Sequence, residues 1–321
     1  MRTLRRLVVL AVVVAAGVAA VRFAAGAPGP EFAGRLEPPM WGQDGPAVLI
    51  DASHWNDGTR ATRLRGLAGL LTADGYVLLP DGNATRAETL SAARIGVIVN
   101  PLGVPGVLRV AADRVGLGGL AFFDDDGLIL QELETTVQWV ENGGSLLVAA
   151  DESPRARGSQ ALAARFGVTM RGRPVVDVGH AEPSSPGWLV FSRENGLVGA
   201  HPVVDGIGGL PPVNRVVVFG AQALDVPAGA VALLRLGPSA TEVARAGDPP
   251  TTGTPVEGRA VAVALSRGRG RVVVLGDSHL LTNDPAPGGV ATGLEWPSTN
   301  NTRFVRAVFA WLARRDEPPR R

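Results

Sequence analysis

The chain has 321 residues, 45% hydrophobic and 19% charged, which are the proportions of a globular protein with a buried core. Basic and acidic residues almost balance, and the net charge of +1 creates no attraction for nucleic acid. Cysteine and lysine are both absent from the sequence. These absences exclude disulfides, thiolate nucleophiles, and the pyridoxal phosphate and P-loop enzymes that need a lysine amine.

The first 27 residues have the pattern of a targeting segment. Three arginines precede an apolar run over residues 7–21, and small residues continue to Ala27. A basic flank before an apolar stretch of this length is typical of a signal peptide, and a retained membrane anchor fits equally well. We therefore expect an extracytoplasmic bacterial protein, anchored in the membrane or secreted to the periplasm or cell exterior. Residues 28–45 are rich in Pro and Gly and are expected to form a linker.

From residue 46 onward, short apolar runs alternate with amphipathic helical patterns. This alternation predicts a parallel sheet with helices on both faces. The expected fold class is α/β, with a doubly wound, mostly parallel sheet of the flavodoxin-like or class I amidotransferase-like kind, in a domain over residues 46–315. The expected strands lie at 47–51, 76–79, 95–100 and 145–150, and the expected helices at 63–74, 85–93, 128–141 and 301–313.

Residues 168–237 have a different pattern, with many Pro and Gly residues and short β-like runs. We interpret this stretch as a β-rich insertion in the same domain. Two further strands are expected near the C-terminus, at 260–265 and 271–275. Between them, the sequence Arg267-Gly268-Arg269-Gly270 favours a hairpin turn. A site for a polyanion is the alternative interpretation of this arginine–glycine run.

In open parallel sheets, ligands bind beyond the carboxyl ends of the strands, so the polar residues there are the candidates for a site. The first, third and fourth predicted strands are followed by Asp51, Asn100 and Asp151, and the strand near the C-terminus by Asp277. If these strands are neighbours, the side chains would meet in one cleft; otherwise they only cap the following loops. The predicted ligand-binding residues are Asp51, Ser53, His54, Trp55, Asn56, Asn100, Asp277, Ser278 and His279.

The catalytic alternative is a serine hydrolase. Gly276-Asp277-Ser278 resembles the nucleophile block of the SGNH or GDSL hydrolases, and Asp51-Ala52-Ser53-His54 has the spacing of their Asp-x-x-His block. In that family the serine block comes first, so this chain would need a circular permutation. Ser278 would be the nucleophile, with His54 or His279 as its base and Asp51 orienting the base. The G-x-S-x-G motif of other serine hydrolases is absent.

A metal site is a weaker alternative. His54, His279 and the two aspartates at these strand ends are suitable ligand types, since imidazole and carboxylate both bind zinc. No spacing such as H-E-x-x-H supports the idea, and the sequence leads us to expect neither a metal nor a cofactor.

Several short phrases occur in an order that resembles the amidotransferase-like domains known as DUF4350. They include LIDASHWN, VIVNP, WVENGGSLLVAADE, HPVVDGI and GRGRVVVLGDSHLLTN, within residues 46–313. These domains look related to the GIFT domains of gliding-motility transport components and intraflagellar transport proteins, and the ThuA-like group is the alternative relative. The resemblance implies a class I glutamine amidotransferase-like fold. True amidotransferases use a cysteine nucleophile, which this sequence lacks, so their chemistry is not implied.

Together, the targeting segment and the resemblance predict an exported, membrane-associated, non-catalytic domain that binds a polar ligand or a partner protein. Relatives of the GIFT type are proposed to bind carbohydrate, and some bacterial members look like accessory parts of transport systems. The expected partners are therefore the membrane, a transport-complex protein and carbohydrate, and not nucleic acid. Trp55 would offer a stacking face to a sugar. A serine hydrolase and a structural scaffold of a membrane assembly are the alternatives.

Overall fold

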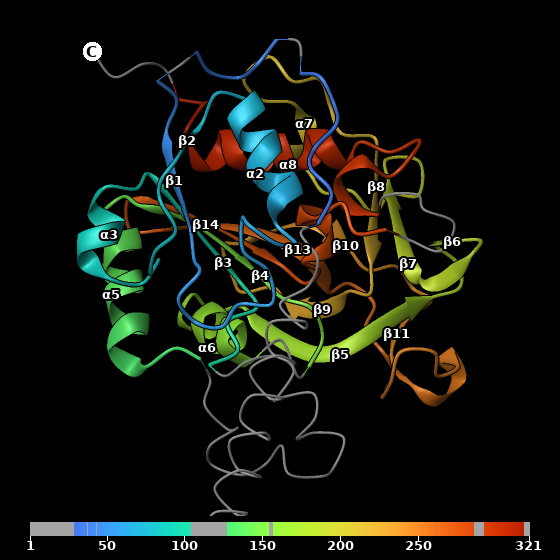
Figure 1. Cartoon of the computed structure of the whole chain (residues 1–321). Coiled ribbons are helices and arrows are strands. Elements are labelled where there is room, and N and C mark those ends of the chain that lie inside the picture. Colours follow the sequence, from blue (N-terminus) through green and yellow to red (C-terminus); the bar gives the residue numbers. More distant parts are fainter. Residues whose placement is uncertain are drawn as a thin grey trace, which may run out of the picture.

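The computed structural model describes residues 29–36, 38–42, 44–103, 127–153, 157–285 and 292–317. A single large sheet runs through the centre, with helices on both sides of it (Figure 1). The predicted targeting segment, residues 1–27, lies outside the described residues. Within the described part of the chain, no helix is long and apolar enough to cross a membrane.

One half of the sheet is parallel. Its strands follow the order β14-β4-β3-β1-β2, and every neighbouring pair in this series is parallel. Buried Val, Ile and Leu dominate these strands because both of their faces are covered. The strands are β1 (Ala47–Ile50), β2 (Val77–Leu78), β3 (Ile95–Val99), β4 (Ser145–Ala149) and β14 (Gly270–Leu275). A mixed α/β fold with a parallel series of strands at its centre, as the sequence predicts, is confirmed; the antiparallel half of the sheet was not predicted.

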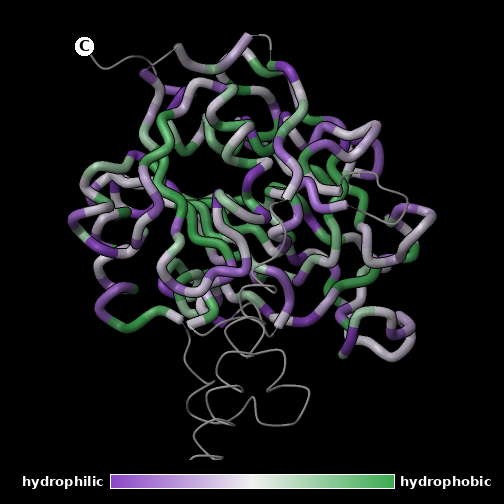
Figure 2. The backbone as a smooth tube through the Cα atoms, in the orientation of Figure 1, coloured by the Kyte–Doolittle hydropathy of each residue, from purple (hydrophilic) through white to green (hydrophobic). Residues whose placement is uncertain are grey.

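Alternate residues of the parallel strands face two separate cores. On one face, Val97 and Leu147 belong to the cluster that contains leucines of α2 and aromatic residues of α8. On the other face, Ile98 and Leu146 pack with residues of α5 and α6. Figure 2 shows that hydrophobic residues are concentrated in these central strands. Side chains of successive strand residues point to opposite faces, so each strand joins the two cores.

The helices agree with the sequence pattern within two residues at most ends. Those predicted at 63–74, 85–93, 128–141 and 301–313 correspond to α2, α3, α5 and α8. The sequence analysis did not predict α6. The helices are α2 (Arg65–Ala73), α3 (Ala87–Ser91), α5 (Leu130–Glu141), α6 (Arg157–Arg165), α7 (Pro202–Asp205) and α8 (Asn301–Leu312), with the short 3₁₀ helices η1 (Pro250–Thr252), η2 (His279–Leu281) and η3 (Gly293–Glu295).

The other half of the structure is antiparallel. Beyond β14, the main sheet continues through β13, β9, β5, β11 and β12, with β10 also paired to β13, while β6, β7 and β8 form a small second sheet. Residues 168–237 are rich in strands, as predicted; that they are an insertion stays a prediction. The strands are β5 (Thr169–Asp177), β6 (Ala181–Glu182), β7 (Ser185–Ser192), β8 (Arg215–Phe219), β9 (Gln222–Asp225), β10 (Val231–Arg235), β11 (Ala240–Glu242), β12 (Thr254–Pro255) and β13 (Ala260–Arg267).

Two further sequence predictions concern irregular segments. The predicted hairpin between β13 and β14 is confirmed, because the two strands pair antiparallel as far as Arg267 opposite Gly270. The described residues of the predicted linker form neither helix nor strand. They nevertheless pack against the domain: Met40 belongs to the buried core cluster that includes residues of α8, and the backbone N–H of Trp41 donates to the carbonyl of Asp74.

Candidate functional site

Four neighbouring parallel strands end in polar residues at the same edge of the sheet. The order β14-β4-β3-β1 places Asp277, Asp151, Asn100 and Asp51 after consecutive strands. The sequence analysis depended on this adjacency, and it is confirmed. The polar side chains do not form a single group, however. They divide into a strand-end site (Arg63, Asn100, Asp151, Asp277, Ser278 and His279) and a second cluster around His54.

Asp151 is the centre of the strand-end site. Its carboxylate is buried, and Oδ1 accepts a hydrogen bond from the backbone N–H of Ser278 at 2.8 Å. Oδ2 accepts from the side-chain amide of Asn100 at 3.0 Å, and the Asn100 oxygen in turn accepts from the backbone N–H of Asp151 at 3.1 Å. The guanidinium of Arg63 lies 3.8 Å from Oδ2. This network fixes the ends of β3, β4 and β14 to one another.

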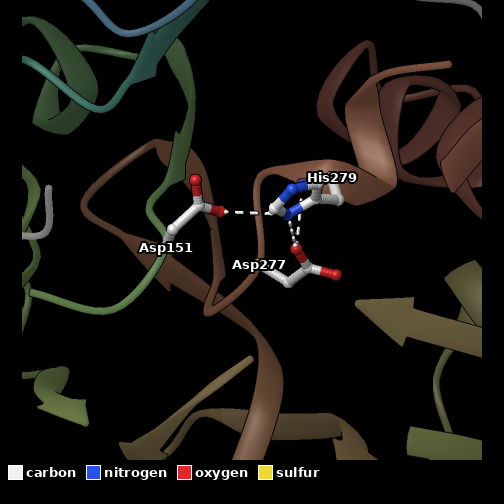
Figure 3. Close-up of side chains that lie close together, drawn as sticks. All are labelled: Asp151, Asp277 and His279. Atoms are coloured by element: carbon white, nitrogen blue, oxygen red, sulfur yellow. Dashed lines mark hydrogen bonds and ion pairs between the residues drawn. The ribbon is translucent and has the colours of Figure 1, made fainter. Parts of the chain in front are cut away.

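One ring nitrogen of His279 contacts two buried carboxylates (Figure 3). Its Nδ1 is 3.1 Å from Asp277 Oδ1 and 3.5 Å from Asp151 Oδ1. Asp277 is held on both oxygens, because Oδ1 also accepts the backbone N–H of His279 and Oδ2 accepts that of Phe219. The other ring nitrogen, Nε2, has no hydrogen-bond partner among the described residues, and 30% of the side chain is exposed. The ring therefore has its Nδ1 held by the carboxylates, while its Nε2 is left for a partner from outside.

The charges of the strand-end site favour a protonated His279. Burial opposes the charged imidazole, but hydrogen bonds to Asp151 and Asp277 outweigh it and raise the pKa of His279 to about 10. Burial would raise the pKa of Asp151, yet its contacts with His279, Arg63 and Ser278 hold that pKa well below its usual range. At neutral pH the site thus contains a protonated His279 beside an ionised Asp151.

Arg63 extends this network toward the surface. Its Nε donates to Asp284 at 2.8 Å and its NH1 to Asp57 at 3.1 Å. Burial would lower the pKa of Arg63, but the surrounding carboxylates raise it, with Asp151 contributing most. Counting Asp57, Asp151, Asp277 and Asp284 against Arg63 and protonated His279 leaves two net negative charges. The edge of the site is therefore suited to a ligand rich in hydrogen-bond donors.

The second cluster joins the end of β1 to the start of α5. His54 donates from Nδ1 to Asp51 at 2.7 Å and from Nε2 to Glu132 at 3.0 Å, and both of its ring nitrogens are thereby used. Glu132 also accepts from Asn83 and from the backbone N–H of Ile129, which begins α5. Burial would lower the pKa of His54, but Asp51 and then Glu132 raise it to about 8. We call this group the His54 clasp (Asp51, His54, Asn83 and Glu132).

The remaining predicted residues lie between or outside these groups. Ser53 and Trp55 are exposed, and Trp55 is 55% accessible with a positive φ of 53°. Asn56 serves the backbone, since its side chain donates to the carbonyl of Val99 and accepts from the N–H of His54. Asn100 also has a positive φ, 42°, a conformation that Asn tolerates better than most residues. The structure thus brings Asn100, Asp277, Ser278 and His279 together, but not Asp51, Ser53, His54, Trp55 and Asn56.

The geometry around Ser278 does not match a serine hydrolase. A nucleophilic serine needs a base within hydrogen-bond reach. The Ser278 hydroxyl is buried and accepts from the Asn100 amide at 3.2 Å. Among the described residues, neither His54 nor His279 forms a hydrogen bond with it. The Nδ1 of His279 faces carboxylates instead, and His54 belongs to the clasp.

One group has the donor set of a metal site. Asp151, Asp277 and His279 each offer one ligand atom, and these atoms lie within 4.8 Å of one another. The set differs from the one weighed from the sequence, because His54 and Asp51 belong to the clasp and Asp151 takes part instead. A metal ion would have to displace the His279 proton, which two carboxylates stabilise.

Some residues that hold the strand-end residues in place were not predicted from the sequence. Arg63 precedes α2 and Glu132 lies in the first turn of α5, and neither follows a parallel strand. Gln222 fixes the end of β4 by donating to the carbonyls of Ala150 and Asp151. Asp151 itself carried a signal, its place after the fourth strand, but it was not among the predicted ligand-binding residues.

Comparison with known proteins supports the fold and goes no further. No model of a known protein family matches the chain, and no curated protein matches it significantly. Among solved structures, the "mmIFT52 N-terminal domain" is similar, with a TM-score of 0.58 and 17% identity, over 85% of this chain and 100% of that domain. At this identity the likeness shows a shared fold alone. Lower-scoring similarities include a cytoplasmic protein from Salmonella typhimurium (TM-score 0.46, 14% identity, 83% and 98% covered) and a ThuA-like protein from Bacteroides uniformis (0.43, 13%, 87% and 94%).

Proposed function

We propose that this chain is a non-catalytic, class I amidotransferase-like domain that binds a polar ligand at the strand-end site, with carbohydrate as the ligand class. The observation that carries the proposal is His279. Two buried carboxylates fix its ring, and its Nε2 edge is partly open to solvent without a described partner. A protonated ring held in this way is a rigid donor that needs no reorganisation when a ligand oxygen binds.

The surroundings of His279 support a ligand with many hydroxyl groups. The side chains of Asp57, Asp284 and Arg63 are each partly exposed at the edge of the site. Carboxylates accept hydrogen bonds from hydroxyl groups, while guanidinium and imidazolium donate to them. Every hydroxyl group of a sugar can both donate and accept a hydrogen bond. A sugar can therefore pair with the carboxylates and with the cationic groups at this edge.

The absence of catalysis in the proposal follows from chemistry already described. The sequence has no cysteine for amidotransferase chemistry, and Ser278 has no histidine partner among the described residues. Its hydroxyl is held instead by Asn100. The proposal therefore treats Ser278 and Asn100 as parts of the frame that positions His279.

The wider identity of the chain belongs to the same proposal. We place it with the DUF4350 and GIFT-type domains on the phrases in its sequence, and the fold shared with the mmIFT52 domain is in keeping with that placement. Export, membrane association through residues 1–27 and a partnership with a transport complex are proposed on the targeting pattern. Residues 168–237 are proposed to be a β-rich insertion in the domain over 46–315.

A glycan array with the full chain in a neutral detergent tests the proposal. Wild-type protein is expected to retain one class of glycan, and His279→Asn is expected to weaken that binding by at least about tenfold. Asparagine can keep the inward hydrogen bond to Asp277 but lacks the outward Nε2–H. His180→Asn is the matched control, because His180 also contacts an aspartate, Asp177, away from the strand-end site. No retained glycan, or equal binding by wild type and His279→Asn, would contradict the proposal.

A further inference from the structure

A cavity lies at the edge of the parallel sheet opposite the strand-end site. Arg94, Gly144 and Arg269 immediately precede β3, β4 and β14, and all three line it. Its volume is about 320 Å³, which is enough for a small ligand. The cavity is therefore separate from the strand-end site, where the same three strands end.

The lining of this cavity is cationic. Three arginines, Arg94, Arg269 and Arg314, contribute to it together with Asn142 and Trp139, and none of the described lining residues is acidic. The strand-end site has the opposite balance, with more carboxylates than cations. A cavity whose described lining contains several arginines and no acidic side chain attracts anions, although Arg314 also pairs with Glu317 beside it.

Capping of backbone carbonyls explains only part of this arrangement. Arg94 donates to the carbonyl of Gly143 just beyond the C-terminus of α5, and Arg314 donates to the carbonyl of Arg269 and to Glu317. The Nε–H of Arg314 is nevertheless buried without a hydrogen-bond partner among the described residues. An unsatisfied buried donor is costly, so a polar partner in the cavity would stabilise it.

The arginine–glycine turn places Arg269 at the cavity. Within Arg267-Gly268-Arg269-Gly270, the side chain of Arg267 pairs with Glu141 at 2.9 Å. Gly268 has a φ of 57°, and a Cβ there would lie 2.7 Å from the backbone of Glu141, so the turn packs closely on the end of α5. The Arg269 guanidinium has no described partner, and Arg269 is one of the residues that line the cavity.

Trp139 forms a fixed aromatic wall. A Cβ on Gly144 would come within 2.3 Å of the indole ring, so the ring lies directly on the glycine backbone. Trp139 also lines the cavity. An aromatic wall beside guanidinium groups suits a ligand that carries both an anionic group and a flat or ring-shaped part.

We propose that this cavity binds a phosphate ester, with the phosphate held by Arg94, Arg269 and Arg314 and the organic part against Trp139. Several guanidinium groups around a single anion are the preferred protein environment of phosphate, because each can donate two parallel hydrogen bonds. The ester is either a soluble metabolite or the headgroup of an anionic lipid, which share this chemistry. The proposal is independent of carbohydrate binding at the strand-end site.

Calorimetric titration of the full chain in neutral detergent with inorganic pyrophosphate and with glycerol phosphate tests the proposal. Binding is expected, and Arg269→Gln is expected to weaken it by at least about tenfold. Arg267→Gln is the matched control, because this arginine belongs to the same turn but pairs with Glu141 outside the cavity. No binding of either compound up to about 10 mM, or equal binding by Arg269→Gln, would overturn the proposal.

Flotation with vesicles distinguishes the two sources of the phosphate. The vesicles contain phosphatidylcholine with or without phosphatidylglycerol, and wild type is compared with Arg269→Gln. If Arg269 is needed for binding to the anionic vesicles, the ligand is a lipid headgroup. If these vesicles bind both proteins equally while pyrophosphate binding still depends on Arg269, the ligand is soluble. Either result supports a phosphate site, provided that the calorimetric dependence on Arg269 holds.

Discussion

His54 and His279 look alike in the sequence but are used differently in the structure. Each follows a parallel strand, three residues after Asp51 or two after Asp277, and each contacts two carboxylates. His54 uses both ring nitrogens, one for each carboxylate. His279 directs Nδ1 to both carboxylates and leaves Nε2 without a described partner. Two carboxylates around a histidine therefore do not by themselves indicate a ligand-binding site. A ring nitrogen without a described partner, as in His279, is the more informative feature.

The elements that supply the carboxylates explain this difference. Asp151 and Asp277 follow the adjacent strands β4 and β14, so both lie on the same side of the His279 ring. Asp51 follows β1, whereas Glu132 belongs to α5 and approaches His54 from the other side. The His54 clasp thus joins a helix to the sheet, and we infer a structural role for it.

The largest expected effect is that of removing the central carboxylate of the strand-end site. Asp151→Ala leaves His279, Asn100 and the Ser278 N–H without their shared acceptor in a buried place. We expect the free energy of unfolding to fall by about 3–5 kcal/mol. Chemical denaturation of the variant measures this loss.

An exposed aspartate provides the control for this experiment. Asp81 pairs with Arg60 at the surface, and Asp81→Ala should cost less than about 1 kcal/mol. A loss for Asp151→Ala as small as that of the control would show that the strand-end network does not hold the strands together.

The next effect is a pH dependence that separates the two histidines. The pKa of His54 lies at about 8 in the folded protein, above its ordinary value of 6.5. Its contribution to stability is therefore complete below pH 6.5 and is lost as the pH rises through 8. The shift corresponds to about 2 kcal/mol. Because the pKa of His279 is about 10, its contribution continues to decline up to that pH.

Denaturation curves of wild type and His54→Gln between pH 6 and 10 check this prediction. The difference in unfolding free energy between the two proteins should shrink as the pH rises from 6.5 through 8 and level off by about pH 9. For His279→Gln, the corresponding difference should keep shrinking toward pH 10. Parallel curves for wild type and His54→Gln over the whole range would refute the prediction.

A smaller effect is expected when one side of the clasp is weakened. Glu132→Gln keeps the shape of the side chain but removes its charge, so the pKa of His54 should fall below 8. The free energy of unfolding should decrease by about 1 kcal/mol at pH 6. Titration of His54 by NMR measures the pKa. An unchanged pKa would mean that Asp51 alone accounts for the protonated state.

The positions of the site strands along the chain were accessible from the sequence, because apolar runs and helical periods are local patterns. That the strands are neighbours in the sheet was only a condition of the prediction, and the structure supplied it. The residues after β1, β3, β4 and β14 could be named in advance on the rule that ligands bind at strand ends. The division into two groups could not. It depends on Glu132, 78 residues after His54, and on Arg63, which reaches Asp284 across 221 residues.

The direction in which each side chain points could not be predicted from the sequence either. Periodicity and spacing do not tell which ring nitrogen meets a carboxylate or whether a serine faces a histidine. Ser278 follows a strand with a histidine next to it, yet its hydroxyl contacts Asn100. The arginine–glycine turn illustrates the same limit, since the hairpin was predicted but the cavity beside it depends on packing against α5.

The most direct test of the different roles of the two histidines is NMR of the ring nitrogens in full-length protein labelled with ¹⁵N-histidine. The chain has four histidines, which single substitutions can assign. We predict that both ring N–H groups of His54 are protected from exchange and that this ring titrates near pH 8. His279 should show one protected and one rapidly exchanging N–H and stay protonated to about pH 10. Two protected N–H groups on His279, or titration of both rings near pH 6.5, would contradict the account.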